Sequence, residues 1–464
     1  MTSSRRAALG LALSLLLMTA PASAQTAPDA GTAPPPAEPA PTEMLPEPGR
    51  APEMPPAVET QPAAPGNAAA PQPAPAAPAP VATPQPATPD PAPAAAPPPP
   101  PPPAPIPAAA PPPPVEPKDV KLLIASQGGA YQKSQALAYF QPFAKRTGYS
   151  VSSAAFDGSL ASLKAQGSAP KWDVVDLDQE VAAQACQEGL LEPFDAAVLQ
   201  PGPDGTPPAE DFVPGSVQSC GVAGTVWSAL IVYDRGLKTP PTRAEHLFDV
   251  KKYPGKRALP RTPEHTLEMA LLADGVAPAE VYAVLATKEG QDRAFAKLTA
   301  IKEQIVWWDH AAEATDRIAQ KKAAMGLAFN GRAFFAAVKA RQPVATLWDH
   351  QIYHLNVWTV PKGATFAAQA REFIAFATSA GPLADQTRWM PYGPARLSAA
   401  KIAGKHAEIN LDMKPHLPTS PANLSGALAY DGVWWAAPER QPLKDRFAAW
   451  LEGRELPTES ATSQ

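Results

Sequence analysis

The sequence predicts an α/β protein whose folded part is divided into two lobes, and three observations support that prediction. After residue 117, short apolar strands alternate with segments of helical periodicity, which is the pattern of a parallel α/β sheet. Glycine and polar residues follow the strands directly, which indicates a ligand crevice at the carboxyl edge of the sheet. About 347 residues follow residue 117, more than one hydrophobic core ordinarily holds.

The first 24 residues have the pattern of a secretory signal peptide. Arg5 and Arg6 precede an apolar run over residues 7–20, and Ala22-Ser23-Ala24 is a typical cleavage signal. An uncleaved anchor is the alternative, but the apolar run is shorter than the ~20 residues that span a bilayer. We therefore expect cleavage after Ala24 and a periplasmic protein, with the choice between Sec and twin-arginine export left open.

Residues 25–117 form an arm rich in proline and alanine that contains 37 of the chain's 63 prolines. A segment with so few large apolar side chains buries too little surface to offset its conformational entropy, so the sequence predicts disorder with local polyproline II runs. A passive spacer is the simpler interpretation. A tether or a segment that contacts the cell wall is the alternative.

The sequence predicts a series of strands and helices along the folded part of the chain. The first half has strands at 120–125 and 172–178, and helices that end near residues 148 and 187. The second half has short strands near 256–260, 306–309 and 324–329, a helix that starts with Thr262 as cap and Pro263 at its first position, and a helix over 280–301. Further helices are expected at 367–379, 381–387 and 444–451.

Two longer strands, at 226–233 and 352–360, are long enough to cross between the lobes, so the chain visits each lobe twice. That arrangement is typical of a hinged clam that closes on a ligand. The expected boundaries are 118–231 with 357–400 for the first lobe, 232–356 with 401–455 for the second, and a tail at 456–464.

Cys186 and Cys220 lie 34 residues apart in a chain with an export signal, and two cysteines in an exported protein ordinarily form one disulfide. A redox or metal pair would have the Cys-x-x-Cys spacing or histidines nearby. The formal net charge of −5 and the lack of a long basic run argue against nucleic acid as a partner.

Five short motifs occur in one order over nearly all of residues 119–400. They are Ser126-Gln127-Gly128-Gly129-Ala130-Tyr131, Trp172-Asp173-Val174-Val175-Asp176, Glu188-Gly189-Leu190-Leu191, Phe329-Asn330-Gly331 and Tyr392-Gly393-Pro394. In order and spacing the chain resembles the extracellular solute-binding proteins of ABC importers, most closely the spermidine/putrescine-binding branch. The resemblance implies a two-lobed, type II-like periplasmic binding protein fold with two hinge-crossing strands.

The same resemblance points to a set of candidate ligand-binding residues: Gln127, Gly129, Tyr131, Asp178, Glu180, Thr262, His265, Phe329, Asn356 and Tyr392. Trp308 is a further candidate, because adjacent strand residues face opposite ways and at most one of Trp307 and Trp308 can form a stacking wall in the cleft. In that branch aromatic rings enclose a diamine and carboxylates meet its ammonium groups. Here Thr262, His265 and Asn356 stand where acids are expected, and Arg261 adds a positive charge. We therefore expect a ligand with one amine and a polar or acidic opposite end, amino-acid-like or a modified polyamine.

Motifs for enzyme chemistry are missing from the sequence. It has no Gly-x-Ser-x-Gly, His-Glu-x-x-His or phosphate-binding Gly-x-x-x-x-Gly-Lys motif, and its seven histidines lack metal-ligand spacing. We expect no enzyme activity, no cofactor and no metal. The expected partners are a small solute and the membrane subunits of an ABC importer, with a monomeric protein. A periplasmic scaffold or sensor that depends on the Pro-rich arm is the alternative.

Overall fold

A computed structural model of the chain describes residues 116–454. The predicted signal peptide, nearly all of the Pro-rich arm and the tail at 456–464 lie outside the described residues. Within residues 116–454, no helix has both the length and the apolar character needed to cross a membrane.

The described strands form one mixed sheet in the order β2-β1-β3-β9-β5-β8-β6-β7, with β4 and β10 paired to β5 and β11 paired to β9. Their bounds are β1 Lys121–Ser126, β2 Ser150–Ala155, β3 Val174–Asp178, β4 Val217–Gln218, β5 Gly221–Asp234, β6 Arg257–Pro260, β7 Ile305–Trp308, β8 Met325–Phe329, β9 Val344–Thr359, β10 Gly393–Pro394 and β11 Leu428–Ala429.

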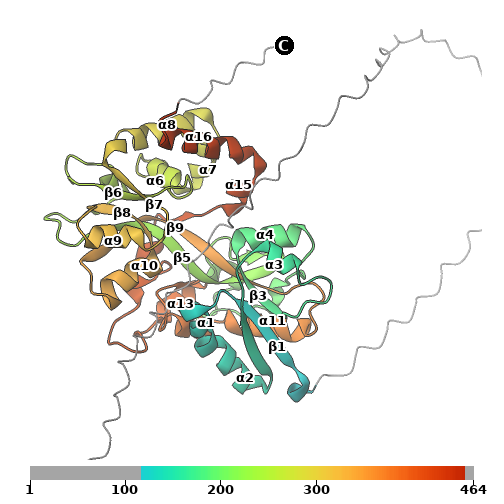
Figure 1. Cartoon of the computed structure of the whole chain (residues 1–464). Coiled ribbons are helices and arrows are strands. Elements are labelled where there is room, and N and C mark those ends of the chain that lie inside the picture. The colour runs from blue at the N-terminus through green and yellow to red at the C-terminus, as the bar shows by residue number, and fades with distance from the viewer. Residues whose placement is uncertain (1–115, 455–464) are drawn as a thin grey trace, which may run out of the picture. The chain divides into compact units, whose positions relative to one another are not determined.

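The two longest strands, β5 and β9, connect the two halves of this sheet. They have 14 and 16 residues and pair antiparallel from Gly221↔Thr359 to Asp234↔Val344. In Figure 1 they run between the group that contains β1, β3, α2 and α11 and the group that contains β6, β8, α6 and α8. The prediction of two crossing strands is confirmed. The parallel pattern holds for β1 with β2 and β3, and for β6 with β7 and β8.

The helices cover both groups of strands. The α-helices are α1 Gly129–Gln135, α2 Gln141–Thr147, α3 Leu160–Lys164, α4 Gln179–Gln187, α5 Pro208–Asp211, α6 Thr266–Leu272, α7 Val281–Leu285, α8 Lys288–Thr299, α9 Glu313–Ala319, α10 Asn330–Phe334, α11 Ala367–Ala377, α12 Ala380–Gln386, α13 Leu397–Ile402, α14 Pro421–Leu424, α15 Gly432–Ala436 and α16 Gln441–Leu451. Shorter 3₁₀ or π-helical turns are η1 Pro117–Asp119, η2 Ala136–Phe140, η3 Ala196–Val198, η4 Ala244–Leu247, η5 Pro278–Glu280, η6 Lys302–Gln304, η7 Phe335–Lys339, η8 Lys414–His416 and η9 Pro438–Arg440.

Two helix predictions are corrected. The helix expected from Pro263 begins at Thr266, because His265 takes a positive φ of 64° and turns the chain before the helix. The helix expected over 280–301 is two helices, α7 and α8. The Thr287 side chain caps α8 by accepting from the Gly290 backbone N–H, and a Cβ on Gly290 would lie 1.9 Å from the Val284 carbonyl oxygen. Only glycine fits at this tight break.

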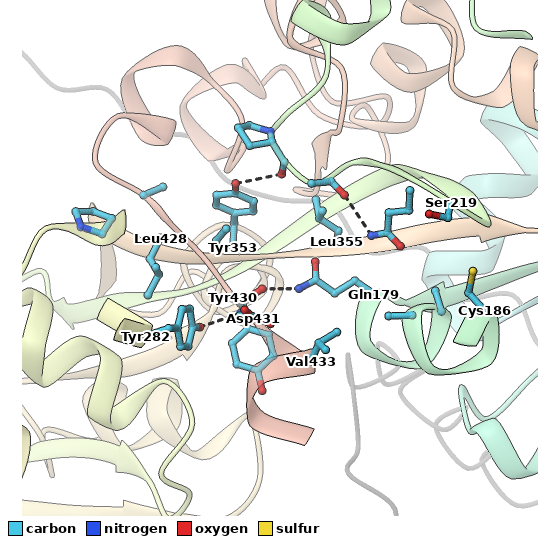
Figure 2. Close-up of a pocket in the computed structure, with 18 of the residues that line it drawn as sticks. Gln179, Cys186, Ser219, Tyr282, Tyr353, Leu355, Leu428, Tyr430, Asp431 and Val433 are labelled. Carbon is cyan, nitrogen blue, oxygen red and sulfur yellow. Dashed lines mark hydrogen bonds between the residues drawn. The ribbon is translucent and has the colours of Figure 1, made fainter. Parts of the chain in front are cut away.

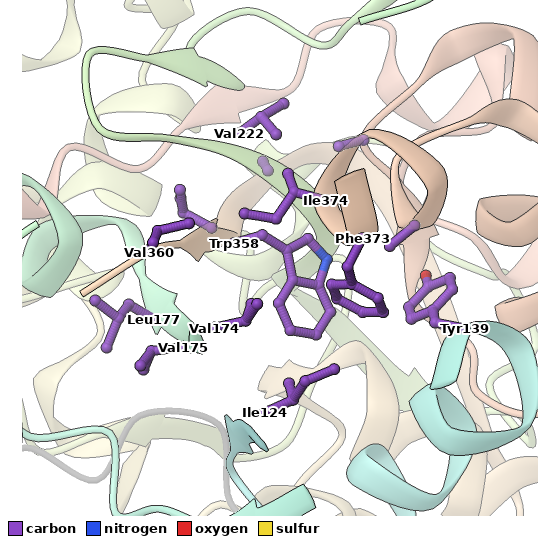
Figure 3. Close-up of a cluster of buried hydrophobic side chains, with 14 of the residues drawn as sticks. Ile124, Tyr139, Val174, Val175, Leu177, Val222, Trp358, Val360, Phe373 and Ile374 are labelled. Carbon is purple, nitrogen blue, oxygen red and sulfur yellow. The ribbon is translucent and has the colours of Figure 1, made fainter. Parts of the chain in front are cut away.

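Each group of strands has its own apolar core, as a two-lobed protein requires. In the first, Trp358 of β9 is fully buried and packs edge-on against Tyr139 and Phe373, with ring centroids 6.1 and 5.5 Å away (Figure 3). The second core lies around β8, α6, α8 and α16, and includes Leu271 and Phe447. The predicted fold class, a two-lobed α/β binding-protein fold, is confirmed.

A segment of the C-terminal part, residues 428–436, returns to the crossing strands, and we call it the strap. Its strand β11 pairs in parallel with β9 at Leu428↔Ile352 and Ala429↔Tyr353. The strap borders a groove of about 840 Å³ that β9 lines with Tyr353 and Leu355 (Figure 2). Because side chains alternate along a strand, His354 and Asn356 face the opposite side of the sheet.

The predicted disulfide between Cys186 and Cys220 is present, with the two Cα atoms 5.8 Å apart. It links the end of α4 to the turn that leads into β5. The bond therefore fastens the end of α4 to the start of β5, one of the crossing strands.

Candidate functional site

Asp178, the last residue of β3, lies where the first lobe meets the crossing strands. Its register partner is Asn356 of β9. The Asp178 carboxylate oxygen Oδ1 accepts hydrogen bonds from Gln127 Nε2 at 3.3 Å and from Asn356 Nδ2 at 3.1 Å. Only 8% of Asp178 is exposed, and burial raises the pKa of its carboxyl group to about 6. The structure thus brings three of the predicted site residues together around one buried acid.

Glu180 adds a second carboxyl group on the first turn of α4. Burial, and next the nearby charge of Asp178, raise the pKa of Glu180 to about 8. Its oxygen Oε2 is buried and has no hydrogen-bond partner among the described residues. Two neighbouring carboxyl groups that are costly to ionise when the site is empty form an acidic end suited to a cation.

An aromatic cluster adjoins Asp178. Tyr131 and Tyr392 meet edge to face with centroids 5.7 Å apart, and Trp227 meets Phe329 in the same way at 5.3 Å. Trp308 contacts the other side of Phe329 at 6.1 Å. These five rings come from five different segments of the chain. Their π faces are of the kind that attracts cations.

A stack of rings continues from Trp227 toward the strap. The His354 ring lies 3.8 Å from Trp227 and 4.1 Å from Tyr430, nearly parallel to Trp227. The His265 Nε2 atom lies 2.8 Å from His354 Nε2, which is hydrogen-bonding distance between two neutral imidazoles. Burial lowers the pKa of His265 to about 4 and that of His354 well below its ordinary value. The pair is therefore uncharged at neutral pH.

The indole N–H groups of Trp227 and Trp308 are buried hydrogen-bond donors with no acceptor among the described residues. A buried donor without a partner costs free energy that a bound acceptor would recover. Each of these donors would therefore be stabilised by a ligand oxygen that reached it.

The hydroxyl group of Tyr392 lies within electrostatic reach of charges of both signs. Burial raises the pKa of Tyr392 to about 12, the Arg332 guanidinium opposes that rise, and the Asp178 carboxylate adds to it. Arg332 is on α10, and its neighbour Gly331 lies against the Tyr392 ring, since a Cβ there would be 3.1 Å from the ring. A positive and a negative group thus both act on the hydroxyl of one buried ring.

Other predicted positions have different surroundings. Gly129 begins α1 with a φ of 55°, next to Gly128 at 79°, so this turn after β1 requires glycine. Thr262 is exposed and its hydroxyl donates to the Glu264 carbonyl. Arg261 forms an exposed ion pair with Asp309 at 3.0 Å, so its charge is already matched at the surface.

No pattern in the sequence singles out Trp227, His354 or Tyr430 as site residues. Trp227 of β5 and His354 of β9 are register partners. Their contact depends on the register in which the two crossing strands pair, and the sequence does not show that register. Tyr430 comes from the strap, far along the chain. No group of three or more His, Cys, Asp or Glu side chains within residues 116–454 is arranged to hold a metal ion.

Comparison with known proteins agrees with this geometry. The family model described as bacterial extracellular solute-binding protein matches residues 138–419. A γ-aminobutyric acid-binding protein of Pseudomonas aeruginosa is 38% identical over 332 residues, which are 71% of this chain and 90% of the relative.

Two solved structures with the same fold have similar sequence identities and TM-scores to this chain. An ABC transporter substrate-binding protein from Bradyrhizobium japonicum is 29% identical, with a TM-score of 0.60 over 72% of this chain and 100% of its own. The Atu4243–GABA receptor is 30% identical, with a TM-score of 0.58 over 73% of this chain and 100% of its own.

Proposed function

The chain belongs to the bacterial extracellular solute-binding proteins, and we propose that its solute is a short zwitterion with a terminal amine and a carboxylate, of the γ-aminobutyrate class. As a member of that family it is a binding protein for a small polar solute, which it delivers to the membrane subunits of an ABC transporter. The family and its relatives here are binding proteins rather than enzymes.

The observation that carries the proposal is the placement of opposite charges about Tyr392. Asp178 and Glu180 supply an acidic end for the ammonium group, and Arg332 supplies a positive charge within electrostatic reach of the Tyr392 hydroxyl. The unpartnered indole N–H groups of Trp227 and Trp308 are further donors for a carboxylate. A ligand that carries one charge of each sign matches both sets of groups.

A symmetric diamine, as in the spermidine/putrescine branch, fits this arrangement less well. Its second ammonium group would meet the positive charge of Arg332, and a desolvated charge that lacks an opposite partner costs several kcal/mol. The names of two relatives, a γ-aminobutyric acid-binding protein and a GABA receptor, agree with the zwitterion.

The remaining predictions from the sequence are part of the same proposal. The ligand-binding set keeps the predicted residues, with Asp178 and Glu180 for the amine and Trp308 for the carboxylate, and gains Trp227 and Arg332 for the carboxylate. The lobes have the boundaries given above and close about β5 and β9 as a monomer. Export into the periplasm follows cleavage after Ala24.

Calorimetry on the mature protein tests the proposal with γ-aminobutyrate, putrescine, butyrate and butylamine. We expect γ-aminobutyrate to bind at least about 10-fold more tightly than each compound that lacks one of its charges, since each lost charge-assisted contact removes about 1.5–3 kcal/mol. Putrescine binding as tightly as γ-aminobutyrate, or no binding of any amine, would overturn the assignment. Mass spectrometry of natively purified protein identifies a retained ligand independently.

A further inference from the structure

We propose that the strap is a specificity-determining wall of the cleft, and that Gly432 restricts the acidic end to an unsubstituted primary ammonium group. The inference rests on the proposed function and extends it by stating which amines the cleft rejects. It concerns N-methylated analogues, which have the same charges as the amino acid.

The aromatic cluster alone does not make this distinction. Rings such as Trp227 and Tyr392 attract a quaternary ammonium group as well as a primary one, and aromatic cages commonly bind methylated amines. Discrimination must therefore come from the groups that surround the nitrogen itself, namely the carboxyl groups of Asp178 and Glu180 and whatever covers them.

Gly432 covers Glu180 at contact distance. A Cβ built on Gly432 would lie 2.7 Å from Glu180 Cβ and 2.8 Å from Glu180 Oε2, closer than real Cβ atoms approach. The strap backbone therefore already occupies the space beside this carboxyl group. A methyl group on a ligand nitrogen needs carbon contacts of about 3.5–4.0 Å, so on the side of Glu180 that faces the strap it would have no room.

Several contacts hold the strap in this position. The Gln179 Nε2 atom donates to the Tyr430 carbonyl, and the Asp431 N–H donates to the Tyr282 hydroxyl at 2.9 Å (Figure 2). The Tyr430 ring stacks on His354 at 4.1 Å. Beyond Gly432, Trp435 is buried and donates to Glu268 Oε1 at 2.5 Å. These bonds tie the strap to both lobes, so making room for a methyl group would break several of them.

The unpartnered oxygen of Glu180 explains why a primary ammonium is favoured. Asp178 Oδ1 already accepts from two amides, whereas Glu180 Oε2 accepts from none among the described residues. A primary ammonium has three N–H donors and can satisfy this oxygen and a second one at once. Each methyl group removes one donor, and a trimethylated nitrogen leaves the buried oxygen unsatisfied.

The strap also offers a matched control position. Val433 follows Gly432 directly, is 45% exposed and lines the groove on the outer side. Val433→Ala shortens a side chain of the same segment and adds no atom beside Glu180. Gly432→Ala places a methyl group against it.

The experiment measures, by calorimetry on the mature protein, the affinity for γ-aminobutyrate and for its N-methyl and N,N,N-trimethyl derivatives. We expect the wild type to prefer the unsubstituted amine over the trimethyl derivative by at least about 100-fold, which corresponds to the loss of two charge-assisted hydrogen bonds. Gly432→Ala should weaken γ-aminobutyrate binding at least about 10-fold and Val433→Ala should leave it unchanged. Glu180→Gln preserves the shape of the side chain and removes its charge, so it should reduce the ratio between the affinities for γ-aminobutyrate and for its trimethyl derivative.

The outcomes separate the two proposals. If no amine binds the wild type, the proposed function and this inference both fail. If γ-aminobutyrate binds and the trimethyl derivative binds within about threefold of it, the strap is not the filter, although the proposed function stands. Hydrogen exchange adds an independent readout: Gly432→Ala should speed exchange in α4 relative to Val433→Ala, and equal rates would contradict the contact itself.

Discussion

Replacing Asp178 by asparagine should change ligand affinity and stability in opposite directions. The substitution keeps the size of the side chain and one oxygen that Gln127 and Asn356 can still reach from 3.3 and 3.1 Å. It removes the charge that we assign to the ligand amine. A residue that serves only to support the fold would lose stability when changed, so opposite signs identify a binding role.

The loss in affinity follows from burial. Asp178 is 8% exposed, so its pairing with an ammonium group is that of a buried ion pair. Removing one partner of such a pair costs about 3–5 kcal/mol, which is roughly a 150- to 5,000-fold rise in Kd. Arg332 and the indole groups at the other end are unchanged, so butyrate binding should change little.

The gain in stability has a definite pH dependence. Burial raises the pKa of Asp178 from 3.8 to about 6, so the empty protein is stabilised while this group is protonated and loses that stability as the pH rises through 6. Asparagine does not ionise and avoids the loss. The melting temperature of the empty variant should therefore exceed that of the wild type at pH 8, and the difference should vanish near pH 4.

Calorimetry and thermal unfolding of ligand-free protein at pH 4, 6 and 8 measure both effects. Asn356→Ala is a useful comparison, because it removes a donor to Asp178 and should lower affinity and stability together. If Asp178→Asn binds γ-aminobutyrate like the wild type, or melts at a lower temperature at pH 8, the assignment of Asp178 to the ligand amine is wrong.

Three further outcomes are expected. Affinity for γ-aminobutyrate should rise from pH 5 to pH 8 and binding should release protons, because the bound ammonium lowers the raised pKa values of Asp178 and Glu180; calorimetry in two buffers of different ionisation enthalpy counts the protons. Asp211→Ala should destabilise the protein by about 3–5 kcal/mol in urea unfolding, since it leaves Arg396 buried without its partner 3.2 Å away, whereas an effect below about 1 kcal/mol would mean the pair is hydrated. Cys186→Ser should cost about 3–4 kcal/mol, as expected for opening a 34-residue loop, and reductant should then have no further effect on its melting temperature.

The fold could be predicted because its signals are local. Strand β1 is an apolar run that is followed, after Gln127, by two glycines, and those glycines take the positive φ angles that the turn into α1 requires. The length and composition of the 226–233 and 352–360 runs indicated the crossing strands. Boundaries were less certain where side chains decide them, as at His265 and Thr287, because caps and turns compete with helix propensity within a few residues.

The site could be predicted in part. Gln127 follows β1 and Asp178 ends β3, and these two strands pair in parallel, so both residues lie at the carboxyl edge where the sequence predicted a ligand crevice. The resemblance to solute-binding proteins supplied Tyr131, Phe329 and Tyr392.

Tertiary structure alone decided which charges and which walls surround the ligand space. Arg332 acts on Tyr392, whereas Arg261 is paired with Asp309 at the surface. The strap reaches Glu180 from about 250 residues further along the chain, held by pairing with β9 and by packing of Trp435. Strand and helix patterns act over a few residues, whereas these contacts depend on how the lobes and the C-terminal segment pack. The sequence therefore determined the class of the protein, and the packing of distant segments determined the chemistry of its cleft.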